Sequence, residues 1–359
     1  MTDIISSDRS RIDRGYRYGV LRTRAGRLSV IVGMRSAIAT FVLVAAAAAV
    51  AVVSLGSGDF VVPIPDVIAT VLGGGTRKTQ LVVLDWRMPR VLLALALGAA
   101  LGAAGAIFQS LTRNPLGSPD IIGFDSGAYA GALMVMTTAG TGYLAVAAGS
   151  LAGGLATALL VYALAYRRGF HGFRLIIVGI AISAMLASLN TWIILNADLE
   201  LALSASAWGS GSLNTVAWAQ ALPATVIILA LGVIAGLLSR GMHALAVGDE
   251  ASTALGLRGG RVRLELVVVG VGFTATATAT AGPIAFVSLA APQLARRLTR
   301  SAGVALPASA AMGALLLVSS DFVAQRLFAP AQLPAGVITV CLGGAYLIWL
   351  LIMEAKRRP

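Results

Sequence analysis

The sequence predicts an all-α polytopic membrane protein, and three observations support that prediction. The chain has 359 residues, 58% hydrophobic and only 12% charged, whereas soluble domains have about 25% charged residues. Its mean hydropathy is +0.87. The apolar residues form continuous runs that lack the period-two alternation of barrel strands, so spanning helices are expected instead of a β-barrel.

Residues 1–35 precede the first apolar run and contain eight arginines against three aspartates. They include no early apolar stretch of the kind that a cleaved signal peptide needs. We therefore expect a basic cytoplasmic arm over residues 1–35, a membrane domain over residues 36–354 and a cytoplasmic tail over residues 355–359. A role of the arm in lipid binding or regulation is the alternative to a plain basic tail.

Eight runs without Asp, Glu, Lys or Arg follow the arm, and a membrane span needs about 20 residues. The runs cover residues 36–58, 91–112, 126–166, 175–197, 201–239, 266–295, 301–320 and 327–353. The run 126–166 exceeds one span and is expected to divide at Gly140-Thr-Gly142. The run 201–239 is expected to hold an extramembrane piece, residues 208–212, and one span.

The run 266–295 is ambiguous by length, and the charges on its flanks decide how often it crosses. Arg261 and Arg263 precede it, and a second arginine cluster begins at Arg296. If both clusters are cytoplasmic, an even number of crossings lies between them, and Gly282-Pro283 is the natural break. The result is about ten transmembrane helices with both termini cytoplasmic.

The basic residues support this orientation, because all but five of the 27 lysines and arginines are then cytoplasmic. The exceptions are Arg77, Lys78, Arg87, Arg90 and Arg326. Positive charge outside opposes the positive-inside rule, so the last three are expected to bind carboxylates on an external partner. Interfacial snorkelling is the alternative. Arg77 and Lys78, in a Gly-rich loop, are expected to be solvated.

Several long motifs follow one another in a fixed order. They are Arg87-Met-Pro-Arg90 with Gln109, Arg113-Asn-Pro-Leu116 with Gly123, residues 245–256, residues 282–296, Asp321 with Arg326, and Leu333-Pro-Ala-Gly336. With these motifs the chain resembles, over roughly residues 36–354, the FecCD-type permeases of binding-protein-dependent ABC importers. Gln293 and Ser288 depart from the family's usual His and Gly. The Pro-Gln-Leu-Ala-Arg-Arg form is most similar to the ferric-enterobactin branch.

The resemblance implies the fold of the family's vitamin B12 permease, with inverted-repeat character, in the bacterial cytoplasmic membrane. It implies import of a ferric siderophore by alternating access through a permease dimer, with vitamin B12 or haem as alternative cargo. The implied partners are two ABC ATPase subunits, a second and paralogous permease chain, and a periplasmic or lipoprotein substrate-binding protein. Arg87, Arg90 and Arg326 would receive that binding protein.

Two cytoplasmic features complete the resemblance. Pro115 disfavours helix at Asn114 and forces a turn, and the resemblance makes Asn114 and Leu116 part of the cytoplasmic gate. Asp249 and Glu250 favour a helix start, and Gly256 favours its end. The resemblance makes this piece a knob that docks on the ATPase, through Gly248, Asp249, Glu250, Ala251, Leu255 and Gly256. A simple turn and a capped connector are the alternatives.

The chain is not expected to be an enzyme. It contains no G-x-x-x-x-G-K-[ST] motif, so ATP hydrolysis is expected in a separate subunit. The single cysteine, Cys341, and the two histidines, His171 and His243, do not predict a metal site, and neither a catalytic site nor a cofactor is expected. The net charge is +12. The basic residues that produce it flank the apolar runs and do not form one stripe, which favours lipid over nucleic acid as a partner.

Two other classes of function remain open from the sequence. An ATP-independent secondary transporter usually carries ionisable residues in mid-membrane, whereas Asp125, Glu265 and Asp321 lie near the expected span ends. Such a transporter would also have no use for the knob at residues 248–256. A structural or regulatory helix bundle without transport activity is the remaining alternative.

Overall fold

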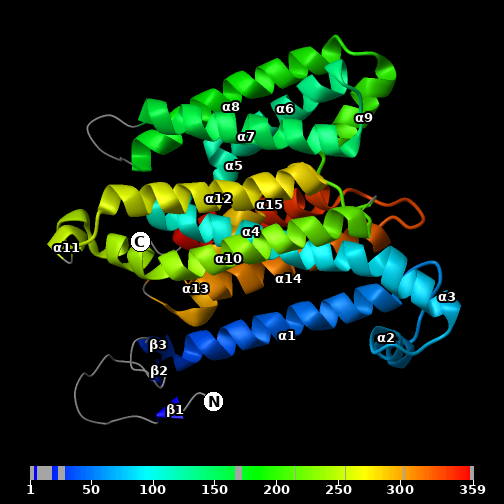
Figure 1. The fold of residues 1–359 in the computed structure, drawn as a ribbon, viewed down its shortest axis with the longest axis horizontal. Coiled ribbons are helices and arrows are strands. Elements are labelled where there is room, and N and C mark those ends of the chain that lie inside the picture. Colours follow the sequence, from blue (N-terminus) through cyan, green and yellow to red (C-terminus); the bar gives the residue numbers. More distant parts are fainter. Residues whose placement is uncertain are drawn as a thin grey trace.

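The computed structural model shows a bundle of long helices that share one general direction (Figure 1). It describes residues 4–5, 18–22, 29–165, 172–214, 216–254, 256–301, 303 and 305–355. The longer helices are α1 (Met34–Gly56), α4 (Met88–Thr112), α7 (Tyr143–Ala165), α8 (Gly172–Leu195), α10 (Trp218–Val247), α12 (Gly259–Ala281), α14 (Leu306–Arg326) and α15 (Ala335–Ala355). The shorter ones are α2 (Ile64–Val71), α3 (Arg77–Gln80), the π-helix η1 (Leu81–Arg87), α5 (Pro119–Ile122), α6 (Phe124–Thr138), α9 (Leu199–Gly209), α11 (Asp249–Ala254) and α13 (Val287–Thr299).

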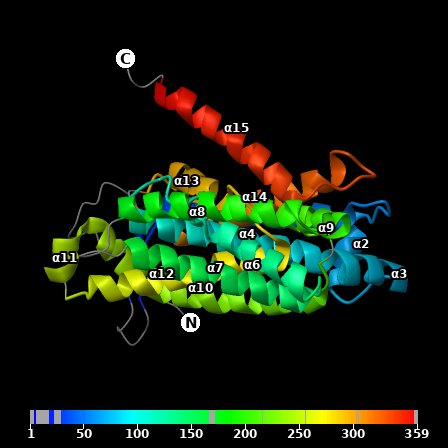
Figure 2. The same ribbon diagram turned by 90° about the horizontal axis from the view of Figure 1, so that it is seen from above.

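Seven helical segments in the described part of the chain are long and apolar enough to cross a membrane. They are α1, the continuous segment Arg77–Thr112, α7, α8, α10, α12 and α14. Three further helices, α6, α13 and α15, correspond to the remaining predicted spans. Helices α6 and α13 have only 15 and 13 residues, and α15 leaves the bundle at an angle in Figure 2. The prediction of an all-α polytopic membrane protein is confirmed.

The predicted interruptions at Gly140-Thr-Gly142 and at Gly282-Pro283 are confirmed, whereas Trp208 and Gly209 of the expected piece 208–212 belong to helix α9. Helix α6 ends at Thr138 and α7 begins at Tyr143, with Gly140 in the left-handed region between them. Helix α12 ends at Ala281, and Gly282 takes a φ of +75° that favours glycine. Helix α13 then begins at Val287, so the run 266–295 forms two helices joined by irregular backbone.

The two ends of the bundle carry the elements that the charge pattern assigns to opposite sides. Helix α11 and the start of α1 lie at one end, on the left in Figure 1, and α15 runs toward that end. Helices α2, α3 and α9 lie at the other end. The start of α1 and the end of α15 therefore share one side, as an even number of crossings requires.

Helix α4 runs through the centre of the bundle, and most of its apolar window is buried. It crosses α14 so closely that a Cβ atom on Gly98 would collide with the α14 backbone at Gly313, and one on Gly102 would collide with it at Ser309. Small residues at such a crossing allow the two backbones to approach, which gives packing energy where no hydrophobic effect operates. The α4–α14 pair is thus the rigid centre against which the other helices pack.

Three short strands precede α1 and form an antiparallel sheet in the order β1-β2-β3. They are β1 (Ile4–Ile5), β2 (Tyr18–Arg22) and β3 (Ser29–Gly33). The segments that join them lie outside the described residues. The basic arm therefore contains paired strands, which its sequence did not predict, and its cytoplasmic placement and lipid-binding role stay predictions.

Candidate functional site

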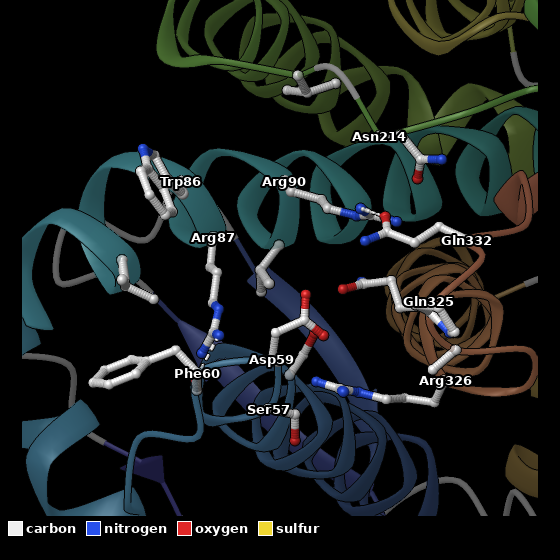
Figure 3. A pocket seen from close by; sticks show the side chains of 17 residues that line it. Ser57, Asp59, Phe60, Trp86, Arg87, Arg90, Asn214, Gln325, Arg326 and Gln332 are labelled. Atoms are coloured by element: carbon white, nitrogen blue, oxygen red, sulfur yellow. Dashed lines mark hydrogen bonds between the residues drawn. The ribbon is translucent and has the colours of Figure 1, made fainter.

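The structure brings Arg87, Arg90 and Arg326, the arginines expected to bind an external partner, together around one cavity, which we call the vestibule (Figure 3). It has a volume of about 300 Å³ and lies where the end of α1, the start of α4 and the end of α14 meet. Arg87, Arg90 and Arg326 all line it, together with Asp59 and Gln332. Residues that are far apart in the sequence thus form one polar surface at the end of the bundle that holds α2 and α3.

Arg90 is bound inside the protein by a carboxylate that the sequence did not pair with it. Its Nε and Nη2 atoms each lie 2.9 Å from an oxygen of Asp321 on α14, and its Nη1 donates to Gln332 Oε1 at 3.1 Å. Asp321 is 1% exposed and also accepts a hydrogen bond from Gln325. The two-pronged geometry neutralises both charges and ties α4 to α14. An external carboxylate would have to compete with Asp321 for Arg90.

Arg87 holds the loop that follows α1. Its Nη1 donates to the carbonyl oxygen of Leu55 and its Nη2 to that of Phe60, each at 2.7 Å. Carbonyl groups at the end of a helix have no partner within the helix, so the guanidinium satisfies one of them. Because both partners are neutral, these bonds leave the positive charge of Arg87 in the vestibule.

Arg326 is the last residue of α14 and reaches into the vestibule from the side opposite Arg87. Figure 3 shows Asp59 between the two guanidinium groups. At the same end of the bundle, the Lys78 ammonium group lies 4.3 Å from the centre of the Phe60 ring. Lys78 was expected to be a solvated loop charge, but this cation–π contact gives it a partner. Lys78 does not line the vestibule. The charged residues that do are the three arginines and Asp59, so the vestibule is basic overall.

The Asn114-Pro115-Leu116 turn lies at the opposite end of the α4 helix. Helix α4 ends at Thr112, and Arg113 takes a left-handed φ of 50°. Asn114 Oδ1 accepts a hydrogen bond from the Leu116 N–H at 2.9 Å, so the asparagine stabilises its own turn. The Leu116 side chain is 47% exposed. The predicted turn is confirmed, and its role as a gate stays a prediction.

Two side chains that sequence reasoning left without a role tie this turn to other helices. Arg113 Nη2 donates to the carbonyl oxygen of Leu245 near the end of α10, at 3.0 Å. Gln293 on α13 donates through Nε2 to the Pro115 carbonyl oxygen at 2.8 Å and accepts at Oε1 from the Tyr346 hydroxyl at 3.2 Å. The turn is therefore connected to α10 on one side and to α13 and α15 on the other.

Residues 248–256, which we call the coupling segment after their expected role, fold as the sequence predicts, and that role stays a prediction. Helix α11 begins at Asp249 and ends at Ala254, and Gly256 takes a φ of +77°. The Gly256 N–H donates to the Thr253 carbonyl oxygen at 2.9 Å and closes the last turn. Leu255 and the side chains of Asp249, Glu250 and Ala251 lie outside the described residues. The segment starts three residues after Leu245, which Arg113 contacts.

Asp120 on α5 is a further, half-buried residue that the sequence did not single out. Its carboxylate accepts from the Phe286 N–H at 3.0 Å and from the Ser288 hydroxyl at 2.5 Å. Burial raises the pKa of the Asp120 carboxyl, and both hydrogen bonds lower it. Asp120 thereby holds the start of α13, next to the α12–α13 break, and Ser288 is the hydroxyl that this contact requires.

Comparison with known proteins places this arrangement among transport proteins. The model of the FecCD transport family matches residues 37–353. The chain is 47% identical over 329 residues to the ferric enterobactin transport system permease protein FepG of Escherichia coli (strain K12), covering 92% of this chain and 100% of that protein. It is 33% identical over 346 residues to the achromobactin transport system permease protein CbrC of Dickeya dadantii (strain 3937), covering 95% and 99%. A solved inward-facing structure of a metal-chelate type ABC transporter matches with a TM-score of 0.79 at 27% identity, covering 88% of this chain and 98% of that chain.

Proposed function

Because this chain belongs to the FecCD transport family, we propose that it is the membrane permease subunit of an ATP-driven, binding-protein-dependent importer of a ferric siderophore. The observation that supports the substrate class is the 47% identity to the ferric enterobactin permease over that protein's whole length. Residues 36–354 form the permease domain in this proposal. The chain is a multi-pass protein of the cytoplasmic membrane.

The partners that we propose are those of an ABC importer. Two permease chains pair around a central path, and the second is a paralogous chain. Two ATPase subunits bind the cytoplasmic end, and a periplasmic or lipoprotein binding protein delivers the substrate to the external end. ATP hydrolysis takes place in the separate ATPase subunits.

At the external end, the vestibule receives the binding protein. Arg87 and Arg326 provide positive charge there, since Arg87 donates only to neutral carbonyl groups. Acidic side chains of the binding protein would be steered to this surface by long-range electrostatics. Arg90 contributes mainly by fixing α4 to α14 through Asp321, because its charge is already neutralised.

At the cytoplasmic end, the coupling segment transmits the closure of the ATPase subunits to the gate. Its neighbour Leu245 accepts a hydrogen bond from Arg113, which precedes the Asn114-Pro115-Leu116 turn. The Pro115 carbonyl in turn accepts from Gln293. A displacement of α10 therefore reaches the gate turn and α13 through hydrogen bonds, and alternating access follows if the external and cytoplasmic ends open in turn.

Reconstituted transport tests this function. Vesicles with this chain, the paralogous permease, the ATPase and the binding protein should import ferric enterobactin, the substrate in the name of the 47% identical relative, only when ATP is enclosed with the ATPase. Haem and vitamin B12 serve as competing substrates, and preferential uptake of either would contradict the substrate assignment. Uptake that survives removal of the ATPase would favour a secondary transporter, and full activity with this chain as the sole permease would contradict the paralogous pairing.

A further inference from the structure

The helix that carries Arg87 and Arg90 contains a wide turn just before α4. Residues Leu81–Arg87 form the π-helix η1, and the Met88 N–H donates to the carbonyl oxygen of Val83, five residues before it. Such π-helical turns are rare and often occur at functional positions. The wide turn ends at Arg87, and α4 begins one residue later. Its geometry therefore sets how the arginines of the vestibule are presented.

Pro89 explains why the helix widens at this point. A proline ring clashes with the carbonyl group four residues before it, and proline has no N–H to donate. An α-helical path would direct the Asp85 carbonyl at the Pro89 ring, and the wider turn relieves this clash. The wide turn also gives the Met88 N–H to Val83. The Leu84 carbonyl oxygen thereby loses both of its possible helical donors, since the residue four positions on is Met88 and the next is Pro89.

Trp218 supplies the missing donor. Its indole Nε1 donates to the Leu84 carbonyl oxygen at 2.9 Å. Trp218 is the first residue of α10, and the start of that helix is fixed because Gln220 Oε1 accepts the Ala217 N–H at 2.9 Å. Water could satisfy the same carbonyl, since Trp218 is 38% exposed, but water could not hold η1 against α10.

The segment before α10 also reaches the vestibule. Asn214 and Val216 line it together with Arg87 and Arg90, and Figure 3 shows Asn214 and Arg90 on the upper side of the cavity. The Arg87 guanidinium is bound to two carbonyl groups near the end of α1. Arg87 is therefore held from two directions, its side chain by the loop after α1 and its backbone, through η1, by Trp218.

We propose that Trp218 is a positioning residue for the vestibule, which holds the wide turn of η1 in place and thereby presents Arg87 to the binding protein. This role rests on the proposed function, because it requires that the vestibule receives that protein. Trp218 does not line the vestibule itself and carries no charge, so it acts through backbone geometry. Its loss should shorten the life of the docked complex without slowing its formation, since attraction between charges acts mainly on the association rate.

Surface plasmon resonance on the complete complex in lipid nanodiscs tests this role, with binding protein loaded with ferric enterobactin as the probe. Trp218→Phe keeps an aromatic ring but removes the N–H. It should raise the dissociation rate about threefold, as expected for the loss of one hydrogen bond, and leave the association rate unchanged. Trp192→Phe is the matched control, because it removes an indole N–H from α8 outside the vestibule lining and should change neither rate. An unchanged dissociation rate in Trp218→Phe would overturn the proposal.

Pro89→Ala provides a rescue that a merely structural tryptophan would not show. In a wide turn the restored N–H at position 89 reaches the Leu84 carbonyl, and in an α-helical turn the Met88 N–H does so. The carbonyl then has a helical partner in either case. In a Pro89→Ala background, Trp218→Phe should therefore no longer change the dissociation rate. An effect of the same size as in the wild-type background would overturn the proposal.

A measurement without the binding protein separates this inference from the proposed function. Hydrogen–deuterium exchange over residues 81–92 of the undocked complex should be faster in Trp218→Phe than in the wild type, because the wide turn loosens. Equal exchange would overturn this inference alone. Failure of the wild-type complex to bind the loaded binding protein would overturn the docking function of the vestibule, and the role of Trp218 with it.

Discussion

Arg90 and Asp321 form a buried ion pair, and removal of either side chain would leave the other charge buried without its partner. Asp321 is 1% exposed and accepts from Arg90 through both of its oxygens. Breaking such a buried pair by removing one partner costs about 3–5 kcal/mol. Arg90→Ala should therefore lower the thermal stability of the purified permease by several degrees. A melting temperature equal to that of the wild type would contradict this role for Arg90.

Arg326 should affect docking without affecting stability. Its replacement by glutamate reverses one charge of the vestibule, beside the charge of Arg87. Electrostatic attraction acts mainly on the association rate, so Arg326→Glu should slow binding of the loaded binding protein by about tenfold at low salt. Surface plasmon resonance on nanodisc-embedded transporter measures this rate.

The matched control for Arg326→Glu is Arg77→Glu, an exposed charge at the start of α3 on the same end of the molecule. It changes the net charge equally but does not line the vestibule. Equal slowing by both variants would show that overall charge, and not the vestibule, attracts the binding protein.

Gln293 should affect the coupling of ATP hydrolysis to transport. It joins the Pro115 carbonyl to the Tyr346 hydroxyl, and loss of a buried hydrogen bond costs about 1–3 kcal/mol. Gln293→Leu should lower the amount of substrate imported per ATP hydrolysed, and Tyr346→Phe, which removes one bond, should lower it less. The ratio is measured in proteoliposomes from parallel uptake and phosphate-release assays. An unchanged ratio in Gln293→Leu would mean that the contact is only structural.

At the scale of single elements, the sequence predicted most helices because their signals are local. Uncharged runs predicted the long helices, and glycines predicted the helix ends near residues 140, 256 and 282. It did not predict the Arg90–Asp321 pair or the contacts of Asp120 and Gln293. These link positions more than 50 residues apart, and a linear charge pattern does not show which helices become neighbours.

The stop at Gly256 provides a test of the coupling segment as an element. Its φ of +77° costs a residue with a side chain about 1–2 kcal/mol. Gly256→Val should therefore loosen the end of α11 and lower transport more than ATP hydrolysis. Gly260→Ala is the control, since a Cβ there meets open space and φ is not left-handed. Equal effects of the two substitutions on transport would argue against a special role for the α11 stop.

At the scale of the whole molecule, the number and direction of the spans depend on how the three shorter or outlying helices are placed. Seven segments qualify as spans by length and apolarity within the described residues. An odd number would put the start of α1 and the end of α15 on opposite sides. The count becomes even when α6, α13 and α15 also cross, and the start of α1 and the end of α15 do lie at the same end of the bundle (Figure 1). The positive-inside distribution, which is a property of the whole chain, favours the same answer.

Cysteine accessibility decides this topology. In a Cys341→Ser background, Thr141→Cys lies in the exposed loop between α6 and α7, and Gly260→Cys lies at the exposed start of α12. The loop between α6 and α7 lies at the end with α9, and α12 begins at the end with α11 (Figure 1). A membrane-impermeant maleimide should label Thr141→Cys in intact cells whose outer barrier is permeable to it. It should label Gly260→Cys only after the cytoplasmic membrane is opened. The reverse pattern would invert the molecule, placing the vestibule inside the cell and the coupling segment out of reach of any ATPase.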